Sequence, residues 1–242
     1  MKVLIMSDIH GNRTALEAVL QAAGSVDAVW CLGDIIGYGP DPNDCVSIIK
    51  DIPNLTCLRG NHDSAVIGLT ERTKFNLSAQ KVLEWTEDQL NPIHRQYLLG
   101  LSSQVEIDDV TLAHGSPRDP TWEYIMDVYT ATANFDYFTT AYCFIGHSHL
   151  PVLYYLKNGK DLANVTFVYP GDKTKLPAKC IVNPGSVGQP RDHDPRAAFT
   201  IFDTEEKTWA QHRVNYDIVE VQERMSQAGL PDEYIQRLDL GW

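Results

Sequence analysis

Five apolar runs in this chain each end in a short polar segment that contains histidine, aspartate or asparagine. The five polar segments are Asp8-Ile9-His10, Gly33-Asp34, Gly60-Asn61-His62-Asp63, His114-Gly115 and Gly146-His147-Ser148-His149. Short apolar runs are typical of buried strands, and binding sites in open α/β sheets assemble outside the carboxyl ends of the strands. The pattern therefore predicts an α/β chain in which side chains far apart in sequence meet at one edge of a sheet.

The polar segments supply donor atoms that suit divalent metal ions. The seven candidate ligands are Asp8, His10, Asp34, Asn61, His114, His147 and His149. They offer carboxylate, imidazole and amide donors but no thiolate, a set that suits manganese, iron, cobalt, nickel or zinc better than calcium or magnesium. Together they fit a two-metal hydrolytic centre. Taken singly they have plainer interpretations, because Gly33-Asp34 is also typical of a turn and Asn61-His62-Asp63 of a helix start.

The apolar pattern divides the chain into three parts. Strands are predicted at residues 3–7, 28–32, 55–58, 110–113 and 142–145. Apolar residues recur at helical spacing at 15–23 and 46–49, between the first three strands, which predicts a parallel, right-handed α/β sheet. Residues 64–104 interrupt this rhythm and are expected to form two helices, an excursion on a single domain that covers residues 1–242.

The pattern becomes antiparallel after about residue 151. One hairpin is predicted from strands at 152–156 and 165–169, with Asn158-Gly159 as a favoured tight turn. A second hairpin is predicted from strands at 197–202 and 209–214. Residues 219–240 are expected to be helical, with Gly229-Leu230-Pro231 as a cap.

Charge and cysteine content exclude several classes of protein. The net charge of -12 argues against a broad nucleic-acid-binding or membrane-binding surface. It leaves room for a small phosphoester substrate, because two divalent ions against two aspartates make a site locally positive. Five cysteines without C-x-x-C spacing indicate buried thiols rather than a disulfide framework. No apolar run approaches the ~20 residues that span a bilayer, and the N-terminus reads as a strand, so a cytoplasmic location is expected.

The five segments closely resemble the motifs of the calcineurin-like metallophosphoesterase family, which run D-x-H, G-D, G-N-H-D/E, H-G and G-H-x-H. All five occur here in order between residues 8 and 149. Asn183-Pro184-Gly185-Ser186 resembles a further segment of the small bacterial and archaeal phosphodiesterase branch. The resemblance implies an α/β (α+β) fold, namely a four-layer α-β-β-α sandwich of two mixed sheets with a dinuclear metal site at the carboxyl ends of the strands.

The resemblance also implies a role for each motif residue. Asp8, His10 and His149 would bind the first metal, Asn61, His114 and His147 the second, and Asp34 would bridge both. A hydroxide bridging ions about 3.5–4 Å apart would attack phosphorus in line. His62 would protonate the leaving alkoxide, and Asp63 would orient its imidazole.

One departure from the family pattern bears on the substrate. Protein serine/threonine phosphatases and symmetrical dinucleoside tetraphosphatases carry an arginine shortly after G-D, whereas Ile35-Ile36-Gly37 follow Asp34 here. Loss of that phosphate clamp favours a phosphodiesterase acting on a small, nucleotide-like diester. The alternatives are a phosphomonoesterase or protein phosphatase, a dinucleoside polyphosphate hydrolase, a non-catalytic scaffold and a nuclease. The complete ligand set disfavours the scaffold, and the acidic charge disfavours the nuclease.

Two residues outside the motifs are candidate substrate contacts. Tyr38 lies just past Asp34 and would line a nucleobase or aryl pocket, with a solvated turn as the competing interpretation. Arg191 would contact phosphate, and a surface-loop charge is the alternative. Arg59, directly before Gly60, would either bind substrate or pair structurally with a nearby carboxylate.

Overall fold

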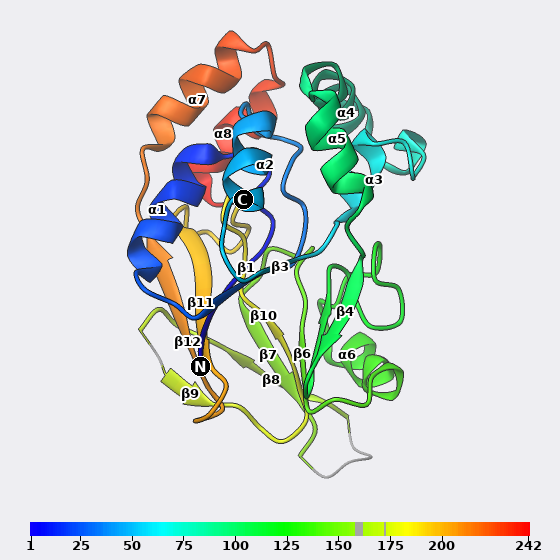
Figure 1. Cartoon of the computed structure of the whole chain (residues 1–242), viewed down its shortest axis with the longest axis vertical. Coiled ribbons are helices and arrows are strands. Elements are labelled where there is room, and N and C mark those ends of the chain that lie inside the picture. The colour runs from blue at the N-terminus through cyan, green and yellow to red at the C-terminus, as the bar shows by residue number, and fades with distance from the viewer. Residues whose placement is uncertain (158–161, 172) are drawn as a thin grey trace.

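The computed structural model describes residues 1–157, 162–171 and 173–242, and these residues form two six-stranded sheets (Figure 1). The first sheet runs in the order β3 (Leu55–Cys57), β2 (Ala28–Cys31), β1 (Lys2–Met6), β11 (Ala197–Asp203), β12 (Thr208–Val214) and β9 (Lys173–Lys175). The second runs in the order β4 (Gln104–Ile107), β5 (Val110–Ala113), β6 (Tyr142–Phe144), β10 (Cys180–Asn183), β7 (Val152–Tyr155) and β8 (Asn164–Phe167).

Both sheets mix parallel and antiparallel pairs. Strand β1 lies parallel to β2, and β2 lies parallel to β3, as the strand–helix alternation predicts. On its other side β1 pairs antiparallel with β11, with Leu4 opposite Ile201. In the second sheet β5 and β10 both lie parallel to β6, whereas β7 lies antiparallel to β10. The predicted combination of two mixed sheets is therefore confirmed.

Alternating side chains on the strands build two cores at once. Val3 and Ile5 of β1 point into the cluster between the sheets, where they join Phe144 of β6. Leu4 and Met6 point the opposite way, into the cluster beneath the helices. Because alternate side chains enter two different cores, every residue of β1 except its first is buried. A strand buried on both faces reads as a continuous apolar run, which is why β1 was recognisable in the sequence.

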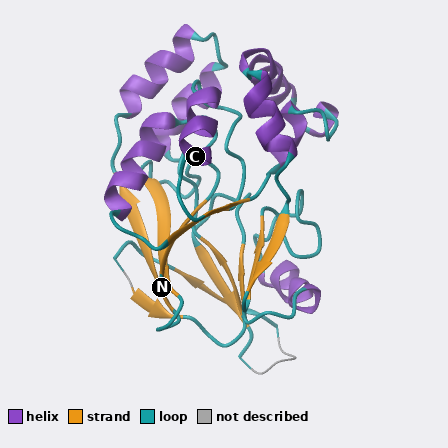
Figure 2. Ribbon diagram, in the orientation of Figure 1, coloured by secondary structure: helices purple, strands orange, loops and turns teal. Residues whose placement is uncertain are grey.

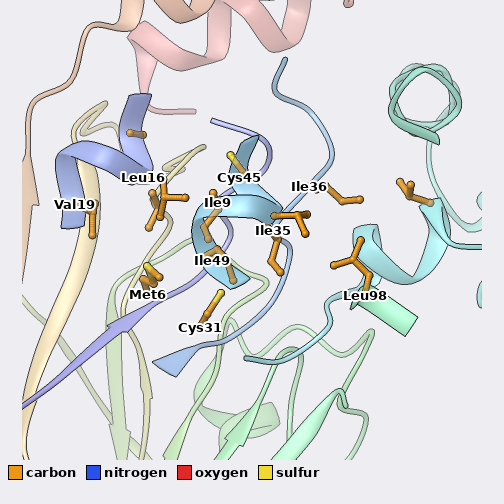
Figure 3. Packing of buried hydrophobic residues seen from close by; sticks show 14 of the residues in the cluster. Met6, Ile9, Leu16, Val19, Cys31, Ile35, Ile36, Cys45, Ile49 and Leu98 are labelled. Atoms are coloured by element: carbon orange, nitrogen blue, oxygen red, sulfur yellow. The ribbon is translucent and has the colours of Figure 1, made fainter. Parts of the chain in front are cut away.

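Helices cover the outer face of each sheet. On the first sheet lie α1 (Arg13–Ala23) and α2 (Pro42–Lys50). Figure 3 shows apolar side chains of both helices, such as Leu16 and Ile49, in the same cluster as Met6 of β1. On the second sheet α6 (Val128–Asn134) and the 3₁₀ helix η2 (Phe135–Tyr137) pack through Ala131 and Phe135. The molecule is thus a four-layer α-β-β-α sandwich, as expected.

The remaining helices gather above the strands in the view of Figure 2. They are α3 (Asn61–Val66), the 3₁₀ helix η1 (Arg72–Lys74), α4 (Leu77–Gln89), α5 (Pro92–Leu99), α7 (Ile218–Gln227) and α8 (Asp232–Leu240). Asparagine side chains at Asn76 and Asn91 cap α4 and α5 by accepting a backbone N–H three residues on. The C-terminal helical stretch is two helices rather than one, because Gly229 has a positive φ of 70° and Pro231 follows it.

The antiparallel hairpins predicted after residue 151 are present. Strands β7 and β8 pair antiparallel, as do β11 and β12, while the predicted Asn158-Gly159 turn lies outside the described residues. The elements that were not predicted include β4, β9, β10, α6 and the two 3₁₀ helices η1 and η2. The edge strand β9 has the sequence Lys-Thr-Lys, which carries no apolar signal. Within the described part of the chain, no helix has the length and apolar character needed to cross a membrane.

Candidate metal centre

The ends of five strands carry the seven candidate ligands to one place. Asp8 and His10 follow β1, Asp34 follows β2, and α3 begins at Asn61 shortly after β3. His114 directly follows β5, and His147 and His149 follow β6. Backbone hydrogen bonds tie the first two loops together, since the amides of Asp8 and His10 donate to the carbonyls of Gly33 and Asp34. Strands of both sheets therefore contribute to one buried cluster.

Five of the seven candidate ligands adopt a left-handed backbone. Their φ angles lie between 50° and 66°, and the residues are Asp8, His10, Asp34, His147 and His149. This region is sparsely populated by residues other than glycine and costs about 1 kcal/mol or more per residue. Such strain persists where the surrounding structure fixes it, and it concentrates at functional sites.

One group of candidate ligands contains Asp8, His10 and His149. The Nε2 atoms of His10 and His149 lie 3.1 Å apart, and Asp8 Oδ1 lies 3.4 Å from Nε2 of His149. The other ring nitrogen of His149 donates to the carbonyl of Gln189 at 2.5 Å, and that of His10 faces the carbonyl of Ile36 at 3.4 Å. These carbonyls place the proton on Nδ1 and leave both Nε2 lone pairs pointing at each other.

A second group contains Asp34, Asn61, His114 and His147. His114 Nε2 lies 3.0 Å from Asn61 Oδ1 and 3.4 Å from Asp34 Oδ2, and its Nδ1 donates to the carbonyl of Leu32. His147 donates through Nε2 to the carbonyl of Trp122 at 3.2 Å, which leaves its Nδ1 free as a ligand atom.

The convergence of acceptor atoms fits divalent cations. Asp34 Oδ2 is buried and has no hydrogen-bond partner among the described residues, although it lies between the Nε2 atoms of His10 (3.7 Å) and His114 (3.4 Å). A buried acceptor without a donor is costly, and so are two imidazole lone pairs that face each other. Cations on either side of Asp34 would satisfy all of these atoms. The residues present therefore fit the metal ions that the sequence predicts.

The charges of the centre are strongly coupled. Burial opposes ionisation of Asp34, but the neighbouring His114, His62 and His10 outweigh it and hold the pKa of Asp34 well below its usual range. Burial likewise opposes protonation of His114, but Asp34 outweighs it and raises the pKa of His114 to about 9. Burial lowers the pKa of His147 to about 3 and raises that of Asp8 to about 7. Without a metal ion, the opposite charges of Asp34 and His114 thus favour each other in the buried centre.

Two glycines let the ligand loops approach one another. A Cβ atom at Gly60 would overlap the carboxylate of Asp34, and one at Gly146 would overlap the hydroxyl of Ser7 and meet Asp8. Only glycine leaves room for these close approaches of backbone to ligand. The glycines in the sequence pattern therefore shape the centre directly.

The orienting contact expected between Asp63 and His62 is absent, and this expectation is corrected. Asp63 accepts backbone N–H groups instead, from Gly60 (2.9 Å), Ile35 (3.3 Å) and Ile36 (3.1 Å). His62 Nδ1 is buried without a hydrogen-bond partner among the described residues. Asp63 therefore ties the loop after Asp34 to the start of α3.

His62 itself is held beside the ligands by rings and backbone. Its amide donates to Asp34 Oδ1 at 2.9 Å, and its ring lies 4.8 Å from that of His10. The rings of Tyr38 and Phe75 lie 4.4 Å and 4.9 Å from it, measured between centroids. The excursion at 64–104 thus reaches the site through Phe75.

The weaker candidates separate into buried and cavity-lining residues. Tyr38 is buried beneath α8, where its ring meets Tyr234 at 4.7 Å, so it supports His10 and His62 and is not a solvated turn residue. Arg59 has a structural role, but its partners are the backbone carbonyls of Leu98, Leu99 and Leu101 and not the carboxylate that was expected.

A cavity of about 380 Å³ opens beside the centre, and we call it the side cavity. It is lined by Tyr124, Met126, Ser148, Leu150, Arg191, Arg237 and Trp242. Ser148 stands between two candidate ligands, and the ring of Tyr124 stacks on that of His147 at 3.7 Å. Of these residues the sequence singled out Arg191 as a substrate contact. Ser148 lies inside the fifth motif, and the other lining residues carry no spacing or motif that distinguishes them from surface residues.

Comparison with known proteins gives a consistent picture across the chain. The sequence profile of the calcineurin-like phosphoesterase superfamily domain matches residues 1–207. An uncharacterized protein of Methanocaldococcus jannaschii is 34% identical over 99% of this chain and 98% of its own length. The crystal structure of a metallophosphoesterase from Sphaerobacter thermophilus is 41% identical, covers 100% of this chain and 99% of its own, and superposes with a TM-score of 0.91.

A third similarity covers only part of the chain. The symmetrical bis(5'-nucleosyl)-tetraphosphatase of Proteus mirabilis is 25% identical over 132 residues, which are 51% of this chain and 47% of that enzyme.

Proposed function

Because the chain belongs to the calcineurin-like phosphoesterase superfamily, we propose that it is a dinuclear-metal phosphodiesterase that hydrolyses a small phosphodiester. The observation that carries the proposal is the position of Asp34 Oδ2, a buried oxygen without a hydrogen-bond partner in the described structure. It lies between His10 and His114, which belong to two separate groups of ligand atoms. One carboxylate shared by two groups is the arrangement that a two-metal site requires.

The ligand groups give each ion its own donors. Asp8, His10 and His149 would hold one ion, Asn61, His114 and His147 would hold the other, and Asp34 would touch both. Ions of the manganese, iron, cobalt, nickel or zinc type, when bound, would supply a nucleophilic hydroxide and neutralise charge on the phosphate. The second ring nitrogens of His114, His147 and His149 donate to backbone carbonyls, which fixes the ring orientations before any ion binds.

His62 is proposed to donate a proton to the leaving oxygen. It forms a third cluster with His10 and Asp34, but those two residues already have other partners in the two ligand groups, which leaves His62 for the proton. Its ring is fixed by Tyr38 and Phe75. Burial lowers the pKa of His62 to about 4 in the substrate-free protein. A bound phosphate opposes this shift, because a neighbouring negative charge favours the imidazolium. The acid would therefore be charged when substrate is present.

Two features favour a diester over a monoester. The residues after Asp34 are the buried Ile35 and Ile36, which offer no cation to the terminal oxygens of a monoester dianion. The side cavity adjoins the centre and has room for a second ester group. A dinucleoside polyphosphate is the second candidate substrate, favoured by the similarity of half of the chain to symmetrical tetraphosphatases.

Metal analysis and substrate comparison test the proposal together. The protein would be loaded with manganese, nickel, cobalt or zinc and assayed on bis(4-nitrophenyl) phosphate, 4-nitrophenyl phosphate and diadenosine tetraphosphate. We expect about two ions per chain and the highest kcat/KM on the diester. A protein that binds no metal and hydrolyses none of the three would refute the proposal. A preference for the monoester or the tetraphosphate would replace the diester assignment.

A further inference from the structure

The side cavity combines an apolar wall with two arginines. Tyr124, Met126, Leu150 and Trp242 supply the apolar surface, and Arg191 and Arg237 supply the charge. Its volume of about 380 Å³ lies in the range of small-molecule sites, about 300–1,000 Å³. Apolar walls with a few charged groups are typical of sites that bind an aromatic ligand and fix its orientation.

Both arginines of the side cavity lack a carboxylate partner within the described structure, and Arg191 donates only to the neutral side-chain oxygen of Gln189 at 3.0 Å. The other arginines are engaged, since Arg59 donates to backbone carbonyls and the rest form ion pairs. Those ion-paired residues are Arg13, Arg72, Arg95, Arg118, Arg196, Arg213 and Arg224. In a chain of net charge -12, two arginines that line one cavity without a carboxylate partner indicate an anionic ligand.

The two arginines lie at different distances from the reaction centre. Arg191 belongs to the loop that follows Gln189, whose carbonyl accepts from His149, and its guanidinium lies 6.0 Å from the ring of Tyr38. Arg237 belongs to α8, where its guanidinium lies 5.3 Å from the ring of Tyr234. Tyr234 in turn meets Tyr38, so Arg237 is one aromatic layer further from the ligands than Arg191. Because both arginines line the side cavity, a ligand with two anionic groups can pair with each of them.

We propose that the side cavity recognises a substrate carrying a second phosphate besides the scissile one, together with an aromatic ring. Arg191 binds the scissile phosphate, Arg237 binds the second phosphate, and the ring lies against Trp242 and Tyr124. This inference rests on the proposed function, because it names the class of diester that the centre cleaves. A nucleotide-type diester with an additional terminal phosphate has this chemistry.

Matched dinucleotides test the second phosphate directly. The metal-loaded enzyme would be assayed on ApA and on its 5'- and 3'-phosphorylated forms, pApA and ApAp. We expect kcat/KM for at least one phosphorylated form to exceed that for ApA by about tenfold to a hundredfold, the effect of one charge-assisted hydrogen-bonded pair. In Arg237→Gln this ratio falls to about one, mainly through KM. Arg13→Gln removes a surface arginine paired with Asp44 and keeps the wild-type ratio.

A binding measurement separates this inference from the proposed function. Calorimetry on the metal-free protein compares adenosine 5'-monophosphate with adenosine, and we expect tighter binding of the nucleotide in the wild type but not in Arg237→Gln. If bis(4-nitrophenyl) phosphate is not hydrolysed, the proposed function fails, while this binding still tests the cavity. Equal kcat/KM for the three dinucleotides, an equal loss on all three in Arg237→Gln, or equal binding of nucleotide and nucleoside would overturn the inference.

Discussion

The strand-end centre and the side cavity are adjacent but built in opposite ways. The ligand side chains are almost completely buried, and most of the ligands sit on left-handed backbone fixed by hydrogen bonds between loops. The cavity residues Tyr124, Met126 and Trp242 are 45%, 58% and 57% exposed. On the proposed function, the loops at the strand ends hold the reacting groups rigidly, whereas helices and loops outside the sheets contact the rest of the substrate.

The largest effect should follow from Asp34→Asn, which changes the oxygen shared by both ligand groups. We expect kcat/KM to fall on the order of a thousandfold or more, with loss of bound metal measured by mass spectrometry. The amide can still accept from the amide of His62, so the fold should survive. Asp136→Asn, an exposed position in η2, is the matched control. Full metal content in Asp34→Asn would contradict the proposal that Asp34 is a ligand shared by both ions.

His62→Gln tests whether the centre includes an acid besides its ligands. We expect retained metal and a loss of about a hundredfold or more on ApA, whose ribose leaving group needs a proton. The loss on bis(4-nitrophenyl) phosphate should be much smaller, because 4-nitrophenolate leaves without one. Equal losses on the two substrates would remove His62 from this role.

The residues of the centre could be singled out from the sequence, whereas most residues of the side cavity could not. The residues that cluster at the centre could be singled out because each follows a short apolar run and the motifs occur in a fixed order. Arg237 and Trp242 could not, because a polar residue on an amphipathic helix and an aromatic residue after it look like ordinary surface. The packing of Tyr234 and Leu238 around Tyr38 brings α8 to the site.

The error concerning Asp63 has a local physical cause. Adjacency in sequence suggested that Asp63 orients His62, but consecutive residues of a helix do not face each other. Both lie in the first turn of α3, where a carboxylate is well placed to accept backbone N–H groups. Helical geometry therefore decided the contact.

The metal-free protein should show the cost of burying His62 in its pH dependence. Burial lowers the pKa of His62 to about 4, whereas the unfolded chain protonates this residue near pH 6.5. On acidification the unfolded state therefore takes up a proton first. Between pH 6.5 and about 4, this lowers the free energy of unfolding by about 1.4 kcal/mol per pH unit. Urea unfolding should show this contribution in the wild type and not in His62→Gln. Parallel pH dependences in the two proteins would contradict the assignment.

Trp242→Leu should give the smallest effect, and this effect should be confined to substrate binding in the side cavity. Loss of the aromatic surface should raise KM for an aromatic diester by about twofold to tenfold. Metal content and unfolding temperature should match the wild type, since the ring of Trp242 is largely exposed and stacks on the exposed His193. A change in metal content would show that the two regions are coupled.

The pairing of β1 with β11 means that β1 cannot complete its sheet until β11 has been synthesised. Asp8 and His10 leave the ribosome early, but the strand before them lies between β2 and β11. At about 5–20 residues per second, synthesis of the segment from Met6 to Ala197 takes about 10 to 40 s. Throughout that interval one edge of β1 lacks its native partner, so the first ligands to be made are among the last to be locked in place.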